Sequence, residues 1–202
     1  SETLTKDNLT ETFKGINGII VPGGFGGRGI EGMILTANYA RENNIPYFGI
    51  CLGMQILVIA YSRYVCGLKD ANSGEFDEDC KNKVIDFMPG QSNEIEKGGT
   101  LRLGAYPCNL KEGSVIRKAY DKESISERHR HRYEVNNDFR EVLEANGMTL
   151  SGLSPNGHIV EMIEIADHPY FIATQAHPEF KSRPDAPHPL FRGLVKAAVK
   201  ML

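Results

Sequence analysis

The pentapeptide Gly49-Ile50-Cys51-Leu52-Gly53 constrains this chain more than any other stretch. Residues 47–50 form an apolar run of strand length, and from residue 52 onward apolar side chains recur at helical spacing. The cysteine between them, with a glycine two residues away on either side, matches a nucleophile elbow in which cysteine replaces serine. The glycines would let neighbouring backbone pass closely, and the helix N-terminus would favour the thiolate. The stretch predicts either a nucleophilic Cys51 or, as for most lone cysteines, a buried one in an ordinary turn.

A second glycine-rich stretch follows the first expected strand at residues 18–22. Five of the seven residues from 23 to 29 are glycine, so backbone N–H groups can approach a ligand closely. The stretch lacks the Gly-Lys-Ser/Thr ending of a P-loop, and its G-x-G-x-x-G spacing has no acidic residue closing a strand about 20 residues later. Two interpretations remain, an oxyanion-hole loop serving Cys51 and a flexible connection from strand to helix.

The order of the expected elements predicts the fold class. Residues 18–22, 30–43, 47–50 and the stretch after residue 52 alternate strand and helix, which is typical of a parallel, doubly wound sheet. Cys51 would then lie at the carboxyl end of a strand, where such sheets place ligands. Residues 150–153, 159–165 and 171–176 read as an antiparallel set, and a helix starts near residue 189. We expect an α/β fold with a doubly wound, mostly parallel central sheet, flanking helices and an antiparallel extension.

Length, charge and cysteine content narrow the class of protein. The 202 residues are enough for one domain, and the formal net charge of −3 gives no basic field that would attract nucleic acid. No apolar run is long enough to cross a membrane. The four cysteines form no CxxC pair and have no metal-site spacing, which indicates reduced thiols and predicts a cytoplasmic protein without a metal site.

Two later stretches carry candidate partners for Cys51. His177 follows a buried strand and has Glu179 two residues on, an arrangement that fits a base and the carboxylate that orients it. Strict alternation in residues 127–135 would place Arg128, Arg130 and Arg132 on one strand face and the two histidines between them on the other. Those arginines fit a nucleic-acid patch, an exposed charged strand or, more naturally, a fork aimed at a carboxylate.

Three separated pieces together resemble one known family. Residues 22–25, 49–55 and 175–180, which read PGGF, GICLGMQ and QAHPEF, look in that order like a class I (triad) glutamine amidotransferase. Residues 71–76 and 127–137 narrow the resemblance to the glutaminase domains of the CTP synthase family, and residues 98–104 agree with it. The similarity covers roughly residues 16–202.

The resemblance implies a reaction and a role for each matching residue. Glutamine would be cleaved to glutamate and ammonia through a glutamyl thioester, with Cys51 as nucleophile, His177 as base and Glu179 as its orienting partner. The backbone N–H groups of Gly24 and Leu52 would form the oxyanion hole. The residues expected to bind glutamine are Gly24, Phe25, Gln55, Glu75 (for the ammonium) and Arg132 (for the carboxylate).

The resemblance also implies a larger enzyme around this domain. Family members carry an N-terminal synthetase domain, assemble as homotetramers, and use the ammonia with ATP and Mg²⁺ to convert UTP to CTP, with GTP as activator. No cofactor is expected in residues 1–202 themselves. These residues would form the glutaminase domain without the strand–helix unit that normally opens it, which predicts an unpaired sheet edge.

Three other functions compete with this interpretation. A stand-alone hydrolase of γ-glutamyl compounds would use the same scaffold, but the stretches around Glu75 and Arg132 disfavour it. A purely regulatory module would need a defect elsewhere, because all three triad residues are present. Nucleic-acid binding through residues 128–132 would be weak and steeply dependent on salt.

Overall fold

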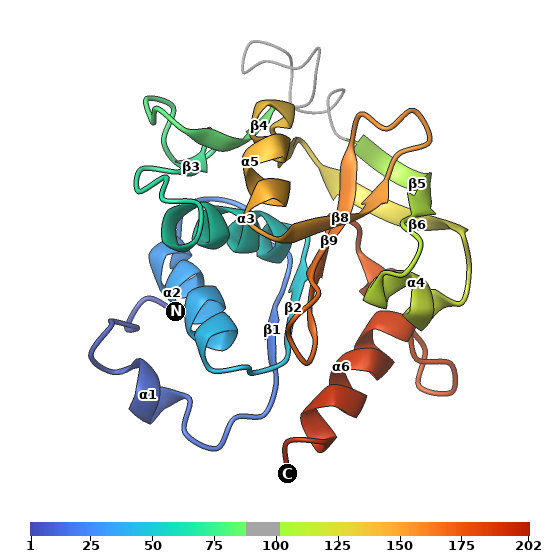
Figure 1. Cartoon of the computed structure of the whole chain (residues 1–202), viewed down its shortest axis with the longest axis horizontal. Helices are drawn as coiled ribbons and strands as arrows, with labels where there is room; N and C mark the ends of the chain where they lie inside the picture. The colour runs from blue at the N-terminus through green and yellow to red at the C-terminus, as the bar shows by residue number, and fades with distance from the viewer. Residues whose placement is uncertain (88–101) are drawn as a thin grey trace.

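The computed structural model describes residues 1–87 and 102–202, which fold around a curled central sheet with helices on both sides (Figure 1). The described residues form seven strands in this sheet, in the order β1-β2-β10-β9-β8-β5-β6. Their bounds, in that order, are Ile19–Val21, Tyr47–Ile50, Phe171–Thr174, Val160–Ile165, Met148–Leu153, Arg102–Leu110 and Ser124–His131.

The first three strands of the sheet are parallel and alternate their side chains between two cores. Tyr47 lies opposite Phe171 in the ladder between β2 and β10, and their rings stack with centroids 4.8 Å apart on one face. The next pair, Phe48 and Ile172, belongs to the core on the other face. Because both faces are covered, these strands read as continuous apolar runs in the sequence.

The other four strands form the antiparallel extension. Strand β9 pairs antiparallel with β10, and β8, β5 and β6 continue in the same manner. The expected α/β fold with an antiparallel extension is confirmed. The sheet is mixed and not mostly parallel, because parallel pairing is confined to β1, β2 and β10.

A small second sheet forms one wall of the region described in the next subsection. It has the order β3-β4-β7 in the described residues, with bounds Asn72–Ser73, Lys83–Phe87 and Tyr133–Val135. Phe87 of β4 lies opposite Tyr133 of β7, and their rings stack with centroids 4.4 Å apart. Strand β7 begins two residues after β6 ends, so the chain passes from the large sheet into the small one at Arg132.

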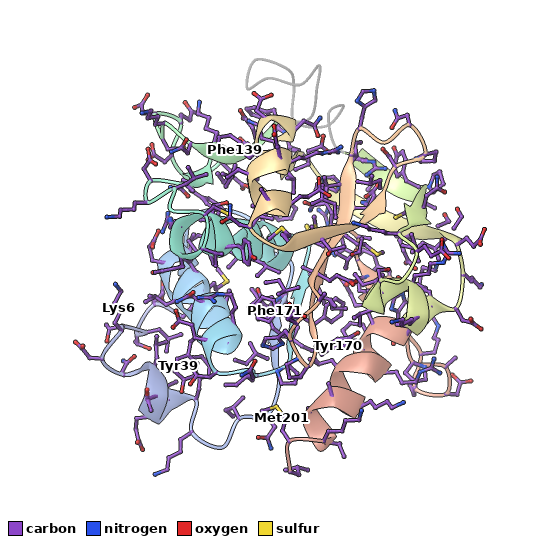
Figure 2. The ribbon with its side chains drawn as sticks, viewed as in Figure 1. Lys6, Tyr39, Phe139, Tyr170, Phe171 and Met201 are labelled. Atoms are coloured by element: carbon purple, nitrogen blue, oxygen red, sulfur yellow. The ribbon has the colours of Figure 1, made fainter. Side chains whose placement is uncertain are left out.

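The helices cover the two faces of the large sheet. Helices α2 and α3 lie on one side of it, and α4 and α6 lie on the other (Figure 1). Two consecutive residues show this division (Figure 2). Phe171, the first residue of β10, packs in the core that contains α2 and α3. Tyr170, just before it, donates a hydrogen bond to the Leu190 carbonyl of α6 at 2.8 Å. The helix bounds are Leu9–Thr12 (α1), Ile30–Glu42 (α2), Leu52–Tyr64 (α3), Val115–Tyr120 (α4), Arg140–Ala145 (α5) and Pro189–Val199 (α6), with 3₁₀ turns at Asn137–Phe139 and Pro178–Phe180.

Most expected elements agree with the structure, and two short helices were not expected. The strand at 47–50 and the helices starting at residues 30, 52 and 189 lie where the sequence predicts them, whereas α4 and α5 have no counterpart in the prediction. Strand β1 pairs only with β2 among the described residues, so it lies at an edge of the sheet. Of the stretch at 98–104, residues 98–101 lie outside the described residues and the rest begins β5.

Candidate active site

Cys51 occupies a sharp turn between β2 and α3. Its backbone has φ 51° and ψ −102°, a left-handed conformation that a residue with a side chain rarely adopts. A Cβ on Gly49 would lie 2.5 Å from the Gly53 carbonyl oxygen, and one on Gly53 would overlap the Val21 carbonyl oxygen. Both glycines are therefore needed for the close passage of backbone that the nucleophile elbow requires.

His177 faces Cys51 across Gly23. A Cβ built on Gly23 would lie 3.0 Å from His177 Cε1 and 3.5 Å from Cys51 Cβ, so the two side chains converge on this glycine. The backbone holds both residues in place: Cys51 N–H donates to the Thr174 carbonyl at the end of β10 (2.7 Å), and His177 N–H donates to the Arg128 carbonyl of β6 (2.8 Å). The predicted pair is thus brought together where β2, β10 and β6 meet.

The imidazole of His177 is oriented by Glu179. Nδ1 of His177 lies 2.6 Å from Oε1 of Glu179, and a carboxylate can only accept, so the proton sits on Nδ1. Nε2 is then a free lone pair, and this atom is buried with no hydrogen-bond partner among the described residues. Such an imidazole is ready to take a proton from a neighbouring group.

The structure corrects one expectation about the thiol. Burial raises the pKa of Cys51 to about 12, although the Leu52 N–H and the Gln175 side chain lower it and the Glu179 and Glu75 carboxylates raise it further. The elbow places the thiol at a helix N-terminus as expected, but desolvation of the thiolate outweighs that stabilisation. Cys51 therefore carries a thiol and not a thiolate at neutral pH, and a nucleophilic role for it would need a base.

A cavity of about 310 Å³ opens beside the thiol. This volume suits a small ligand such as an amino acid. All five residues predicted to bind glutamine line it, together with Cys51. The lining residues are Gly24, Phe25, Cys51, Gln55, Glu75, Glu78, His131, Arg132 and Tyr133.

The cavity wall contains opposite charges. Glu75 accepts a hydrogen bond from the Gly26 N–H of the glycine-rich loop at 3.2 Å. Arg132 has Nε and Nη2 buried without a hydrogen-bond partner in the described part of the chain, and its guanidinium lies 5.8 Å from the centre of the Phe87 ring. Buried donors of this kind are costly unless an acceptor reaches them, and a planar carboxylate matches the fork.

The alternation predicted for residues 127–135 holds along β6 and then stops. Arg128 and Arg130 are exposed, and His129 and His131 are buried on the opposite face. Arg132 does not continue the exposed row, because it lies at the bend between β6 and β7 and turns into the cavity. The guanidinium of Arg130 instead lies 5.8 Å from the centre of the exposed Phe25 ring.

The sequence did not assign several residues of this region. Gln175 Nε2 lies 3.6 Å from Cys51 Sγ, and its Oε1 accepts from Gln55 Nε2 at 3.3 Å. Tyr133 and His131 line the cavity as well. For the histidine the signal was available, since its alternation with exposed arginines places it on the inner face of β6.

Two other kinds of site were sought in the described residues. No group of three or more His, Cys, Asp or Glu side chains is arranged there to hold a metal ion. No helix among residues 1–87 and 102–202 has the length and apolarity needed to cross a membrane.

Comparison with known families agrees with this geometry. The family model described as glutamine amidotransferase class-I matches residues 2–197, nearly the whole chain. The chain belongs to the class I glutamine amidotransferase family. Within this family of amidotransferases, its similarity is to CTP synthases. It is 54% identical to the CTP synthase of Syntrophus aciditrophicus over 99% of this chain, and 59% identical to that of Methanococcus maripaludis over 92%.

Comparison with solved structures agrees with the similarity to CTP synthases. The structure titled "Trypanosoma brucei CTPS - glutaminase domain with bound acivicin" superposes with a TM-score of 0.90 at 40% identity and covers 96% of this chain and 75% of that one. A putative GMP synthase protein from Thermoplasma acidophilum shares the fold, with a TM-score of 0.62 at 16% identity over 95% of this chain and 77% of that one. The chain is thus an amidotransferase domain of the CTP synthase type, and it spans 34–37% of the length of the two CTP synthases named above.

Proposed function

We propose that this chain hydrolyses the side-chain amide of L-glutamine, with Cys51, His177 and Glu179 as its catalytic triad. The observation that carries the proposal is the convergence of Cys51 and His177 on Gly23 beside a cavity with opposite charges in its wall. The free Nε2 of His177 supports its role as the base, because the thiol must lose its proton before it attacks.

The proposed reaction has two halves. His177 Nε2 takes the thiol proton, Cys51 Sγ attacks the amide carbon, and the C–N bond breaks as the proton passes from the imidazole to the departing ammonia. The product is a glutamyl thioester. In the second half His177 takes a proton from water, the hydroxide attacks the thioester carbon, and the C–S bond breaks to give glutamate and the free thiol. Glu179 holds the imidazole in the required tautomer and stabilises its cation throughout.

The N–H groups of Leu52 and Gly24 are proposed to stabilise the oxyanion of each tetrahedral intermediate. Leu52 N–H interacts with the thiol, so it lies at the reacting atom, and Gly24 packs against the Leu52 side chain closely enough that an added Cβ would be 3.0 Å from its Cδ2. Loss of one such donor typically lowers the rate by about 10²–10³-fold.

We propose that the cavity recognises glutamine as a zwitterion. The Glu75 carboxylate would bind the ammonium, and the unpaired donors of Arg132 would bind the carboxylate. Both N–H bonds of Gln55 Nε2 are used, toward the Tyr133 carbonyl and Gln175 Oε1, which leaves the Gln55 oxygen to accept from the substrate. Gly24 and Phe25 complete the wall.

The activity of the longer protein is a further part of the proposal. By similarity to CTP synthases, the ammonia would be used in ATP-dependent amination of UTP to CTP by a synthetase domain of the same polypeptide, within a homotetramer. Mg²⁺ would act with ATP in that domain, and GTP would activate the glutaminase.

The first test is labelling with acivicin, the compound named with the trypanosomal domain, followed by mass spectrometry and an assay of glutamate release. We expect one adduct, on Cys51, that is absent in Cys51→Ala and unchanged in the control Cys80→Ala. Glutamate should appear from glutamine and not from other γ-glutamyl compounds. Adducts spread over the remaining thiols, or glutamate release that persists in Cys51→Ala, would overturn the assignment. A substrate panel that favours γ-glutamyl peptides would instead support the stand-alone hydrolase.

A further inference from the structure

The side chain of Gln175 is buried against the sulfur of Cys51. Its Nε2 lies 3.6 Å from Cys51 Sγ, a hydrogen-bond distance for the large sulfur atom, and the residue is 0% exposed. Gln175 directly follows β10, and its backbone N–H donates to the Glu161 carbonyl of β9 at 2.8 Å. The main chain therefore fixes the point from which this side chain reaches the sulfur. The reaction proposed above gives the contact no role.

The orientation of the Gln175 amide follows from its neighbours. One end of the Gln55 amide lies 3.1 Å from the Tyr133 carbonyl oxygen and 3.3 Å from the Gln175 amide. A carbonyl only accepts, so this end of Gln55 is the nitrogen. The nitrogen only donates, so the atom of Gln175 that faces it is the oxygen. The nitrogen of Gln175 is then the atom that faces Cys51.

A nitrogen donor at the sulfur favours one protonation state of Cys51. A neutral thiol is a weak acceptor, whereas a thiolate carries a full negative charge. Hydrogen bonds to an ionised partner are roughly twice as strong as those between neutral groups. The contact from Gln175 therefore strengthens when the sulfur loses its proton, which is the first step of the proposed reaction.

We propose that Gln175 is a catalytic residue whose side-chain amide stabilises the Cys51 thiolate. Gln55, held by the Tyr133 carbonyl, is the positioning residue that keeps this amide turned toward the sulfur. The inference rests on the function proposed above and adds the donor that serves the nucleophile.

The only other donor assigned to the sulfur has a second task in the proposed reaction. The Leu52 N–H interacts with the thiol and is also proposed to bind the oxyanion. The Gln175 amide is not shared in this way, because among the described residues the cavity is lined by Gln55 and not by Gln175. Gln175 can therefore serve the sulfur when the thiolate forms and again when it leaves the thioester.

Other groups around the sulfur act on the same charge. The Arg130 carbonyl lies 4.0 Å from Sγ and can accept the S–H proton, so it favours the thiol. The charged and titratable side chains that face Cys51 come from three parts of the chain, namely Glu75 and Glu78 after β3, His131 and Arg132 at the end of β6, and His177 and Glu179 after β10. All of them are retained in the variants below.

The first experiment measures the reactivity of Cys51 without turnover. The chain is treated with iodoacetamide between pH 7 and 10, and mass spectrometry follows the alkylation of each cysteine. Gln175→Met removes the donor at similar volume. It should slow the alkylation of Cys51 about 3- to 5-fold, because a tenfold loss of thiolate is partly offset by the greater nucleophilicity of a thiolate of higher pKa. Cys80 in the same samples is the internal control and should react as in the wild type.

Gln175→Glu separates a hydrogen-bond donor from a side chain that only fills space. The new carboxyl keeps the size of glutamine and the oxygen that faces Gln55, but it places a second oxygen against the sulfur. At pH 10, where a buried carboxyl is ionised, Cys51 should react about 10-fold more slowly than in the wild type. Alkylation at the wild-type rate in either variant would overturn the proposal.

Gln55→Met tests the same inference without a substitution at the fully buried position 175. This variant removes the group that holds the Gln175 oxygen, so the amide can turn away from the sulfur. Alkylation of Cys51 should slow, by less than in Gln175→Met, and urea unfolding shows which variants are folded. An unchanged rate in folded Gln55→Met would overturn the proposal.

Steady-state kinetics distinguishes a failure of this inference from a failure of the proposed function. Gln175→Met should lower kcat for glutamine about 10-fold and change KM less than about 3-fold, because the amide acts on the sulfur and does not line the cavity. A raised KM with unchanged kcat would show that Gln175 only supports the cavity wall through Gln55, and would overturn the proposal. If the wild-type chain hydrolyses no glutamine, the proposed function fails, and the alkylation rates still decide the role of Gln175.

Discussion

The carboxylate of Glu179 accepts a hydrogen bond from Nδ1 of His177 at 2.6 Å, and only Pro178 separates the two residues in the chain. The proline opens the 3₁₀ turn Pro178–Phe180, so the orientation of the His177 imidazole is set locally, by one turn of backbone. The Glu179 side chain is 42% exposed, and solvent therefore screens the pair.

This exposure gives a prediction for Glu179→Ala. The variant should lose activity, but about 10²-fold less than Cys51→Ala or His177→Ala, because Glu179 orients the base and does not react. Steady-state kcat for glutamine hydrolysis in the three variants is the measurement. A Glu179→Ala variant as inactive as Cys51→Ala would show that the carboxylate does more than orient.

A second prediction concerns backbone strain at Cys51. The positive φ of 51° favours glycine, so Cys51→Gly should be more stable than Cys51→Ala by about 1 kcal/mol, while both lack activity. Urea unfolding of the two variants isolates the backbone contribution, because both have lost the thiol. Equal stability of the two would mean that the elbow stores no strain.

The third prediction concerns Arg132. Arg132→Ala should raise the KM for glutamine about 10- to 100-fold, since the substrate carboxylate loses a charged partner in a buried site. Arg128→Ala, which removes an exposed arginine from β6, is the matched control and should leave KM unchanged. Similar KM values for Arg132→Ala and the wild type would show that Arg132 does not bind the substrate carboxylate.

The fourth prediction is a pH dependence of stability that originates at Glu134. Burial raises the pKa of this carboxyl to about 7, from an ordinary value of 4.5, with Arg102 opposing the shift. Protonated Glu134 contributes fully to the free energy of unfolding below about pH 4.5. This contribution falls by at most about 1.4 kcal/mol per pH unit as the pH rises to 7, and it is lost above that.

Urea unfolding at pH 5 and pH 8 measures this contribution. Glu134→Gln should lose less stability than the wild type between the two pH values, because its amide does not ionise. Glu144→Gln, at an exposed position of α5, should behave as the wild type does. An identical loss in all three proteins would place the pH dependence elsewhere.

The sequence was most informative where local pattern and tertiary structure agree. The strand and helix around Cys51 have the predicted bounds because β2 is a continuous apolar run between clear boundaries. Gly49 and Gly53, on either side of Cys51, are required by close backbone contacts. The contact between His177 and Glu179 was predicted for the same reason, since the two residues lie two positions apart just after a strand.

The missed elements depend on contacts that no local pattern shows. Helix α4 has six residues, too few for a periodic signal, and its first N–H groups are capped by Glu164 of β9, which accepts from Val115 and Ile116 at 2.8 and 3.0 Å. The raised pKa of the Cys51 thiol was missed likewise, because the local turn predicts the helix N-terminus but not the burial around it.

The last hydrogen bond between the ends of β2 and β10, from Cys51 N–H to the Thr174 carbonyl, holds Cys51 beside the strand that leads to His177. Parallel strands lie about 4.8 Å apart and advance about 3.3 Å per residue, so a change of register between β2 and β10 comes in discrete steps. A one-residue insertion or deletion within either strand would displace one partner by a full step and reverse the face its side chains occupy. The register of β2 and β10 therefore sets where Cys51 lies relative to the segment that leads to His177. The loops at the opposite end of these strands are free of this constraint. They can vary during evolution without changing how Cys51 lies relative to His177.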